Sequence, residues 1–207
     1  MSRKEEILRA TIELASQYGL KSVTLAQIAD RVGIRKPSLY NHFSSKDEIV
    51  QEAYRFLREQ ASGNSAGKDI DYAALCKERS LEEILLASFE QYCSFLLDED
   101  LLRLFKVLYA ERVTSPVAAQ IVVDETEHMI LQVRNLFYAL AVHGKLRNDD
   151  VDMAALSFAM TVHALVDHQL DLLTAAGKGD ACPLGSSFDQ ASAYISWFAR
   201  QMEPAHA

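Results

Sequence analysis

Five polar side chains lie close together in the sequence and have the chemistry of a DNA-contacting surface: Lys36, Ser38, Tyr40, Asn41 and His42. A lysine neutralises phosphate charge, and the hydroxyls and the imidazole can hydrogen-bond phosphate oxygens. An asparagine amide can pair with the edge of an adenine in the major groove. The run predicts contact with double-stranded DNA. The alternative is an ordinary helical hairpin with a solvated polar face.

These side chains need a short helix held against another helix, and the preceding residues predict such a pair. Thr24-x-x-Gln27 is a capping box, which predicts a helix from Leu25 onward. Gly33 then allows a tight turn, because glycine adopts positive φ without a steric cost. A second helix is expected from residue 36 to residue 43. Two short helices joined by a glycine-containing turn form a helix-turn-helix.

The spacing resembles the DNA-binding domain of the TetR (tetracycline-repressor) family of bacterial regulators, over residues 3 to 58. The matching residues are Thr24, Ile28-Ala29, Gly33, Tyr40-Asn41-His42-Phe43 and Lys46. The resemblance implies a phosphate contact for Lys46. Arg35 departs from the family, which usually has a Ser or Thr there. Arginine has no side-chain acceptor and cannot cap a helix, so we expect Arg35 to contact a phosphate or a guanine. The predicted DNA-binding residues are Thr24, Arg35, Lys36, Ser38, Tyr40, Asn41, His42 and Lys46.

Charge is divided unevenly along the chain, whose formal net charge is −8 at pH 7. Residues 1–60 hold ten Lys or Arg and eight Asp or Glu, a net charge of +2, and residues 61–207 carry −10. A mildly basic head on an acidic body is compatible with DNA binding through the head alone. No apolar run is long enough to span a bilayer, and the first residues lack a signal-peptide core. We therefore expect a cytoplasmic protein that does not enter a membrane.

Few turn-forming residues and repeated helix-start signals predict an all-α fold. The 207 residues include only eight Gly and four Pro. We expect an N-terminal three-helix helix-turn-helix head, joined by a fourth helix to a C-terminal helical bundle. The expected division places DNA binding in residues 1–60, and ligand binding and dimerisation in residues 61–207. The expected helices span residues 3–18, 25–32, 36–43, 46–60, 81–97, 101–111, 116–143, 151–176 and 188–202, with a loop or weak helix over 61–80.

Aromatic side chains on three body helices indicate a place for a small molecule. Ligand pockets are commonly apolar, with a few polar groups that orient the ligand. The alternative is that these side chains are simply core. The predicted ligand-binding residues are Phe89, Tyr92, Phe105, Tyr109, Tyr138 and His163.

A cluster of polar residues within an otherwise apolar helix offers a second interpretation: His163, Asp167, His168 and Asp171. Residues four apart share a helix face, and His and carboxylate ligands suit zinc or a similar divalent ion. The cluster could belong to a metal-sensing regulator, or it could be a polar strip with internal His–Asp hydrogen bonds. We expect no cofactor.

Catalysis has no positive support in the sequence. There is no G-x-S-x-G, no P-loop and no glycine-rich dinucleotide turn. An enzyme built on a helical bundle, with a head that merely resembles a DNA-binding domain, remains as the less favoured alternative.

The sequence therefore predicts a ligand-responsive regulator of transcription, a repressor released from operator DNA by a small molecule of unknown identity. Because two-fold symmetric operators are read by dimers, we expect a homodimer formed through the last two helices. The residues expected at its interface are small or apolar: Ala155, Ala159, Ala164, Ala191, Ile195 and Phe198.

Overall fold

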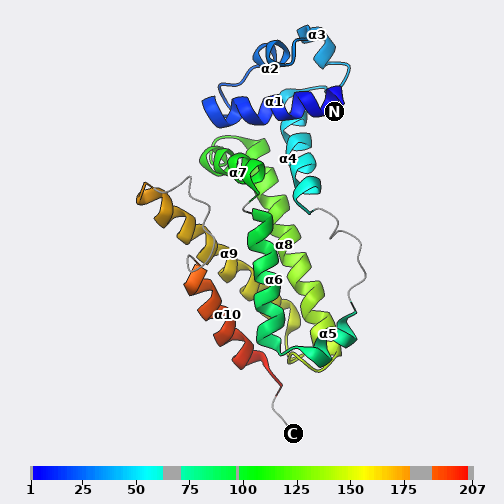
Figure 1. The fold of residues 1–207 in the computed structure, drawn as a ribbon, viewed down its shortest axis with the longest axis vertical. Helices are drawn as coiled ribbons and strands as arrows, with labels where there is room; N and C mark the ends of the chain where they lie inside the picture. Colours follow the sequence, from blue (N-terminus) through cyan, green and yellow to red (C-terminus); the bar gives the residue numbers. More distant parts are fainter. Residues whose placement is uncertain (1, 63–70, 97, 178–187, 205–207) are drawn as a thin grey trace. The chain divides into compact units, whose positions relative to one another are not determined.

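The computed structural model describes residues 2–62, 71–96, 98–177 and 188–204. Over these residues the chain forms ten helices and no strand (Figure 1), which confirms the all-α prediction. The chain divides into two compact units. The first unit combines residues 1–68 with 95–125, and the second combines residues 69–94 with 126–207. The functional boundary at residue 60 stays a prediction, and residues 95–125 pack with the head.

The first unit contains the N-terminal helices and one pair of elements from later in the chain. Its helices are α1 (Arg3–Tyr18), α2 (Leu25–Val32), α3 (Lys36–Leu39), α4 (Lys46–Ser62), α7 (Glu99–Glu111) and the start of α8 (Pro116–Val142). The helix α1 begins at the capping box formed by Ser2 and Glu5, and it ends at Gly19, whose φ is 77°.

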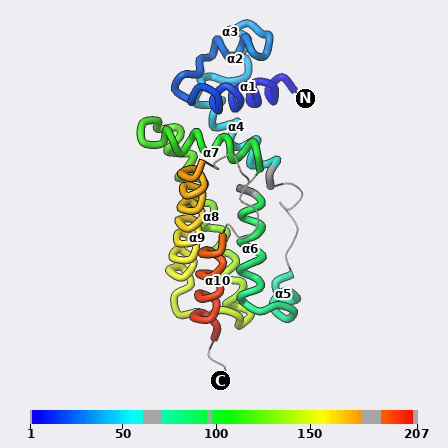
Figure 2. Tube along the Cα trace, turned by 60° about the vertical axis from the view of Figure 1, so that its left-hand side comes forward, coloured from blue at the N-terminus to red at the C-terminus, as the bar shows by residue number. Residues whose placement is uncertain are grey.

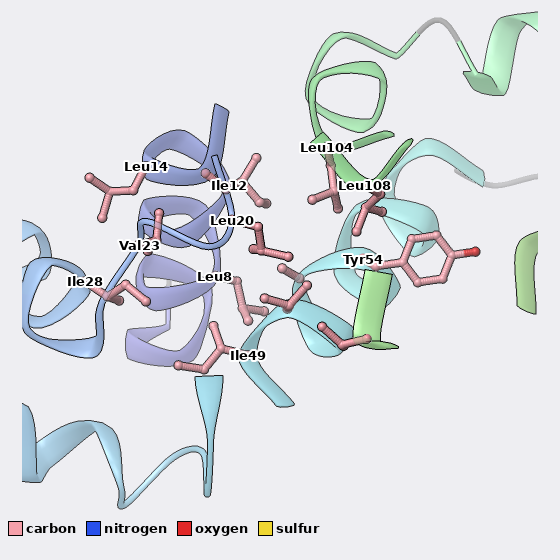
Figure 3. Packing of buried hydrophobic residues seen from close by; sticks show 14 of the residues in the cluster. Leu8, Ile12, Leu14, Leu20, Val23, Ile28, Ile49, Tyr54, Leu104 and Leu108 are labelled. Atoms are coloured by element: carbon pink, nitrogen blue, oxygen red, sulfur yellow. The ribbon is translucent and has the colours of Figure 1, made fainter. Parts of the chain in front are cut away.

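A single hydrophobic core holds the elements of the first unit together. Figure 3 shows side chains from α1, α2, α4 and α7 pointing toward one another, among them Leu8, Ile28, Ile49 and Leu108. Each of these four side chains is at most 3 % exposed. The head predicted from sequence is therefore only part of this unit, because α7 contributes to the same core.

The second unit contains α5 (Tyr72–Glu78), most of α6 (Leu81–Leu96), the remainder of α8, α9 (Val151–Ala175) and α10 (Asp189–Met202). The short helix α5 lies within the segment for which the sequence predicted a loop or weak helix. In Figure 2, α9 and α10 lie side by side and run in opposite directions. Phe137, Phe158 and Phe198 join α8, α9 and α10, with the rings of Phe158 and Phe198 4.9 Å apart.

The predicted dimer-interface residues are mostly interior to the second unit. Five of the six are at most 6 % exposed: Ala155, Ala159, Ala191, Ile195 and Phe198. Only Ala164 faces solvent. The prediction was wrong for the five buried residues, because small and apolar side chains also let helices of one chain approach each other closely.

Within the described part of the chain, no helix is both long enough and apolar enough to cross a bilayer.

Candidate nucleic-acid interface

The helix α2 has the ends that its sequence predicts. The hydroxyl of Thr24 accepts the Gln27 amide N–H at 3.3 Å, and the Gln27 side-chain oxygen accepts the Thr24 amide N–H at 2.8 Å. Gly33 ends the helix in the left-handed conformation, with φ 73° and ψ 34°. This confirms the capping box and the glycine turn, and it shows that the Thr24 hydroxyl is engaged in its own helix.

The second helix of the pair is shorter than predicted. The helix α3 covers only Lys36–Leu39, and residues 40–42 continue as turns in which each amide bonds the carbonyl three residues earlier. Arg35 stands at the N-cap and makes no side-chain capping bond there, as its lack of an acceptor predicts. An uncapped start and residues of modest helix propensity account for the short helix.

The predicted contact residues are displayed on one surface by two buried anchors. Leu39 is 1 % exposed and Phe43 is 3 % exposed, so both point into the core of the first unit. The side chains between and before these anchors are turned outward, and Tyr40 is 53 % exposed. Exposed are Arg35, Lys36, Tyr40, Asn41 and His42, and Ser38 is half-buried.

The surface formed by residues 35–42 is positively charged, and within the described part of the chain its cationic side chains are not neutralised by carboxylates. No Asp or Glu occurs between residues 31 and 46. Among the described residues, no carboxylate forms an ion pair with Arg35 or Lys36. Two cationic side chains without a bound carboxylate are suited to a phosphate backbone.

Lys46 has an intramolecular role that the sequence did not predict. Its ammonium donates to the backbone carbonyls of Leu20 at 2.7 Å and Val23 at 2.9 Å. An ammonium has three donors, so two are committed to the loop before α2 and one is left for the predicted phosphate contact. The side chain is partly buried rather than extended into solvent.

The turn into α4 is fixed by a variant of the capping box. The Ser45 hydroxyl accepts the Glu48 amide N–H at 3.1 Å, as in an ordinary capping box. The Glu48 carboxylate, however, accepts both the hydroxyl and the amide N–H of Ser44 at 2.6 Å. These bonds lower the pKa of Glu48. The turn that follows the exposed face is thus held at its base by the first residues of α4.

A polar cluster in the first unit joins α4 to α8, and sequence reasoning missed it. Arg58 Nε lies 2.9 Å from Glu125 Oε2, and the hydroxyl of Tyr54 donates to the same oxygen. Burial and the hydrogen bond to Glu125 raise the pKa of Tyr54. Glu125 has one partner 67 residues earlier and another 71 residues earlier. No local spacing in the sequence could have indicated either contact.

The six predicted ligand-binding residues are divided between the two units. Phe105 and Tyr109 belong to α7, where the ring of Phe105 packs edge-on against Tyr54 at 6.1 Å and Tyr109 at 6.3 Å. The other four residues lie in the second unit: Phe89, Tyr92, Tyr138 and His163.

In the second unit, two of these four residues are in direct contact. The Tyr92 hydroxyl lies 3.0 Å from His163 Nδ1. His163 Nε2 lies 3.6 Å from Asp167 Oδ2. Phe89 packs its ring against Phe188 at 5.8 Å, whereas Tyr138 is 47 % exposed. The contact between Tyr92 and His163 is a partly buried polar pair that joins α6 to α9.

The geometry of the described residues gives the metal interpretation no support. Among the residues that the structure describes, no three His, Cys, Asp or Glu side chains are arranged to hold a metal ion. His163 and Asp167 form a pair with Tyr92 on one side, while His168 and Asp171 are exposed. The polar-strip interpretation, with an internal His–Asp contact, fits this arrangement.

The fold and the exposed face place the chain in the class of helix-turn-helix proteins. Two family models match it in order. One is "Bacterial regulatory proteins, tetR family", over residues 7–53, and the other is "AefR-like transcriptional repressor, C-terminal domain", over residues 83–180. Together the two models cover more than half of the sequence, and the chain belongs to the TetR family of bacterial transcriptional regulators. This confirms the resemblance seen in the sequence.

Individual relatives resemble this chain either over part of its sequence or in the fold of nearly the whole chain. The HTH-type transcriptional repressor KstR2 of Mycobacterium tuberculosis (strain H37Rv) is 38 % identical over 90 residues, which are 43 % of this chain and 44 % of KstR2. The chain therefore matches less than half the length of this relative. The Flavonoid-responsive Regulator FrrA superimposes with a TM-score of 0.72 and 21 % identity, over 99 % of this chain and 98 % of FrrA. A transcriptional regulator from Saccharomonospora viridis, in complex with choline, gives a TM-score of 0.60 and 20 % identity over 97 % of this chain and 98 % of that one.

Proposed function

We propose that this protein is a DNA-binding repressor of transcription that releases its operator when it binds a small organic molecule. The observation that carries the proposal is the exposed face of residues 35–42, which is cationic and polar and rests on the buried anchors Leu39 and Phe43. The test is a selection of genomic DNA fragments by the full chain. A reproducibly enriched sequence is expected, and no enrichment over input would contradict the proposal.

The exposed side chains divide into two roles. Tyr40 and His42 donate to phosphate oxygens, and Arg35 binds a phosphate or a guanine edge. Lys36, Ser38 and Asn41 face the base edges in the major groove. Thr24 supports the contact indirectly, because its hydroxyl caps α2.

The operator-binding form is proposed to be a homodimer. One recognition helix covers a small stretch of DNA, and two-fold symmetric sites are read by two copies about one helical turn apart. The helices α9 and α10 offer apolar side chains that face solvent: Met153, Leu156 and Met160 on α9, and Trp197 on α10. Residues 153, 156 and 160 follow a helical spacing and lie on one face. We assign the interface to this exposed stripe, in place of the buried residues expected from the sequence.

The second unit is proposed to bind the effector near Tyr92 and His163. Their contact is a partly buried polar pair between two apolar helices, which is the kind of group that orients an organic ligand. Phe89 lies on the same helix as Tyr92, three residues earlier. FrrA is named as flavonoid-responsive and the S. viridis regulator holds choline, which favours an organic effector over a metal ion. Phe105 and Tyr109 are assigned to the core of the first unit rather than to the ligand.

Release is proposed to follow from differential affinity. An effector shifts the protein only by binding its two states unequally, and the coupling is reciprocal. Operator DNA should therefore lower the affinity of the protein for a true effector. The factor should equal that by which the effector lowers the affinity for DNA. For any compound found by thermal-shift screening, equal affinity with and without operator would exclude it as the effector.

A further inference from the structure

The loop between α1 and α2 is held from two sides by charged side chains that lie far away in the sequence. On one side, the amide N–H of Lys21 donates to both carboxylate oxygens of Glu111, at 3.2 and 3.1 Å. On the other side, Lys46 donates to the carbonyls of Leu20 and Val23. Three backbone groups of this six-residue loop, residues 19–24, are thus bound by one anion and one cation. Every residue involved belongs to the first unit.

The carboxylate of Glu111 lies directly against the backbone at the start of this loop. A Cβ added at Gly19 would lie 3.0 Å from Glu111 Oε1. The φ of Gly19 is also positive, at 77°, which a residue with a side chain rarely adopts. Gly19 therefore has two roles. It turns the chain out of α1, and its lack of a side chain leaves room for the Glu111 carboxylate.

Glu111 occupies a position that its own helix does not favour. It is the last residue of α7, where the helix dipole disfavours an anion, and the last turn of α7 contains no basic residue. Its carbonyl accepts the amides of Thr114 and Ser115, both at 2.9 Å, so the residue is fixed in the turn between α7 and α8. The contact with the loop offsets the unfavourable interaction of the Glu111 carboxylate with the helix dipole. This indicates that the main role of the carboxylate is to bind the loop.

The loop in turn determines where α2 begins. Leu20 and Val23 are each 2 % exposed, and Figure 3 shows them in the same core as Leu104 and Leu108 of α7. The N-cap Thr24 follows immediately. A shift of the loop would therefore move the start of α2, and with it the face carried by the next helix.

We propose that Glu111 is a positioning residue for DNA recognition: its carboxylate fixes the α1–α2 loop, and through that loop the helix-turn-helix, without itself contacting DNA. The inference rests on the proposed DNA-binding function. It also assigns Lys46 to the same task, as the clamp on the opposite side of the loop.

The test compares Glu111→Ala with Glu111→Gln in the full chain. Hydrogen exchange of the Lys21 amide is measured by NMR without DNA, and affinity is measured on the DNA that the wild type selects. In Glu111→Ala, the Lys21 amide should exchange about tenfold faster and DNA affinity should fall about tenfold, because a charge-assisted bond is lost. Glu111→Gln keeps an acceptor oxygen and should recover most of both.

Two controls separate positioning from general electrostatics and from loss of fold. Glu127→Ala removes the same charge from an exposed site on α8 and should leave both readouts unchanged. The salt dependence of DNA binding should also be unchanged in Glu111→Ala, because no phosphate contact is removed. Thermal unfolding of each variant verifies that it is folded.

Two results would overturn the positioning role: unchanged Lys21 exchange in Glu111→Ala, or faster exchange with wild-type DNA affinity. If the wild type selects no DNA, the proposed function fails and the positioning role fails with it. The exchange experiment, which contains no DNA, distinguishes that outcome from failure of the clamp itself.

Discussion

Residues within and beside the exposed face differ in what holds them in place. Asn41 and His42 follow α3 in a turn whose amides bond the carbonyls three residues earlier. Their side chains are exposed. Lys46 is different, because two of its donors are bound to Leu20 and Val23. A residue free to meet DNA and a residue that supports the scaffold should behave differently on substitution.

Asn41→Ala tests base reading at a single residue. The variant loses the amide that is proposed to pair with an adenine edge, so preference at one base pair should relax by about 1–3 kcal/mol. Affinity for unrelated DNA should stay at the wild-type level, because no charge is removed. Binding to a panel of single-base operator variants measures this directly. A uniform loss over the whole panel would instead assign Asn41 to the backbone.

At the scale of elements, α4 is the helix that connects the exposed face with the rest of the first unit. It begins with Lys46, beside the loop before α2, and it carries Tyr54 and Arg58 to Glu125 on α8. The carboxylate of Glu125 is only 12 % exposed and the side chain of Arg58 is 26 % exposed. A largely buried carboxylate with two donors holds a helix more firmly than exposed ion pairs do.

A double-mutant cycle on Arg58→Ala and Glu125→Ala measures this contact. Each single variant should lose about 1–3 kcal/mol of unfolding free energy, because it removes one partner of a partly buried charged group. The coupling energy should be about 1–2 kcal/mol. The exposed pair of Arg31 and Glu13, at 3.2 Å, is the matched control, and its coupling should stay below about 1 kcal/mol. A coupling at Arg58 and Glu125 no larger than in the control would contradict this account of α4.

For the whole molecule, the proposed assembly depends on apolar side chains that one copy leaves in water. Trp197 is 52 % exposed and Met160 is 42 % exposed, on adjacent helices of the second unit. Large apolar side chains exposed on neighbouring elements are typical of protein–protein interfaces. A two-fold axis would pair this stripe with itself.

Trp197→Glu combined with Met160→Glu should dissociate the dimer, since each glutamate would carry a charge into the buried interface. The wild type should have twice the chain mass of 23.1 kDa by sedimentation, and the double variant should have the mass of one chain. Val113→Glu, which alters a residue that is 88 % exposed in the first unit, is the control. A wild type that sediments as a single chain at micromolar concentration would refute the assembly.

Local signals in the sequence predicted much of the fold and the exposed face. The capping box at Thr24 and the glycine turn at residue 33 depend on neighbours within a few positions, and both are confirmed. Leu39 and Phe43 are four residues apart, a spacing that puts two side chains on the same side of a helical turn, and both are buried beneath the exposed face.

Local signals of this kind could not predict contacts between residues that are far apart in the sequence. Glu111 contacts Lys21 across 90 residues, and no pattern in the sequence indicates that the two residues are in contact. The helix α9 is apolar on more than one side, so its composition could not show that Ala155 faces the core while Met160 faces water. The predicted interface therefore included residues from the wrong side of the helix.

The central claim is that the exposed face of residues 35–42 binds DNA, and the salt dependence of binding to the selected DNA tests it most directly. Affinity is measured for the wild type and Lys36→Ala over a range of salt concentrations. The plot of log affinity against log salt should become shallower by about one unit in Lys36→Ala, because the variant loses a positive charge that displaces counterions from DNA even though the side chain faces the base edges. Equal affinity and equal slope for the two proteins would contradict the claim.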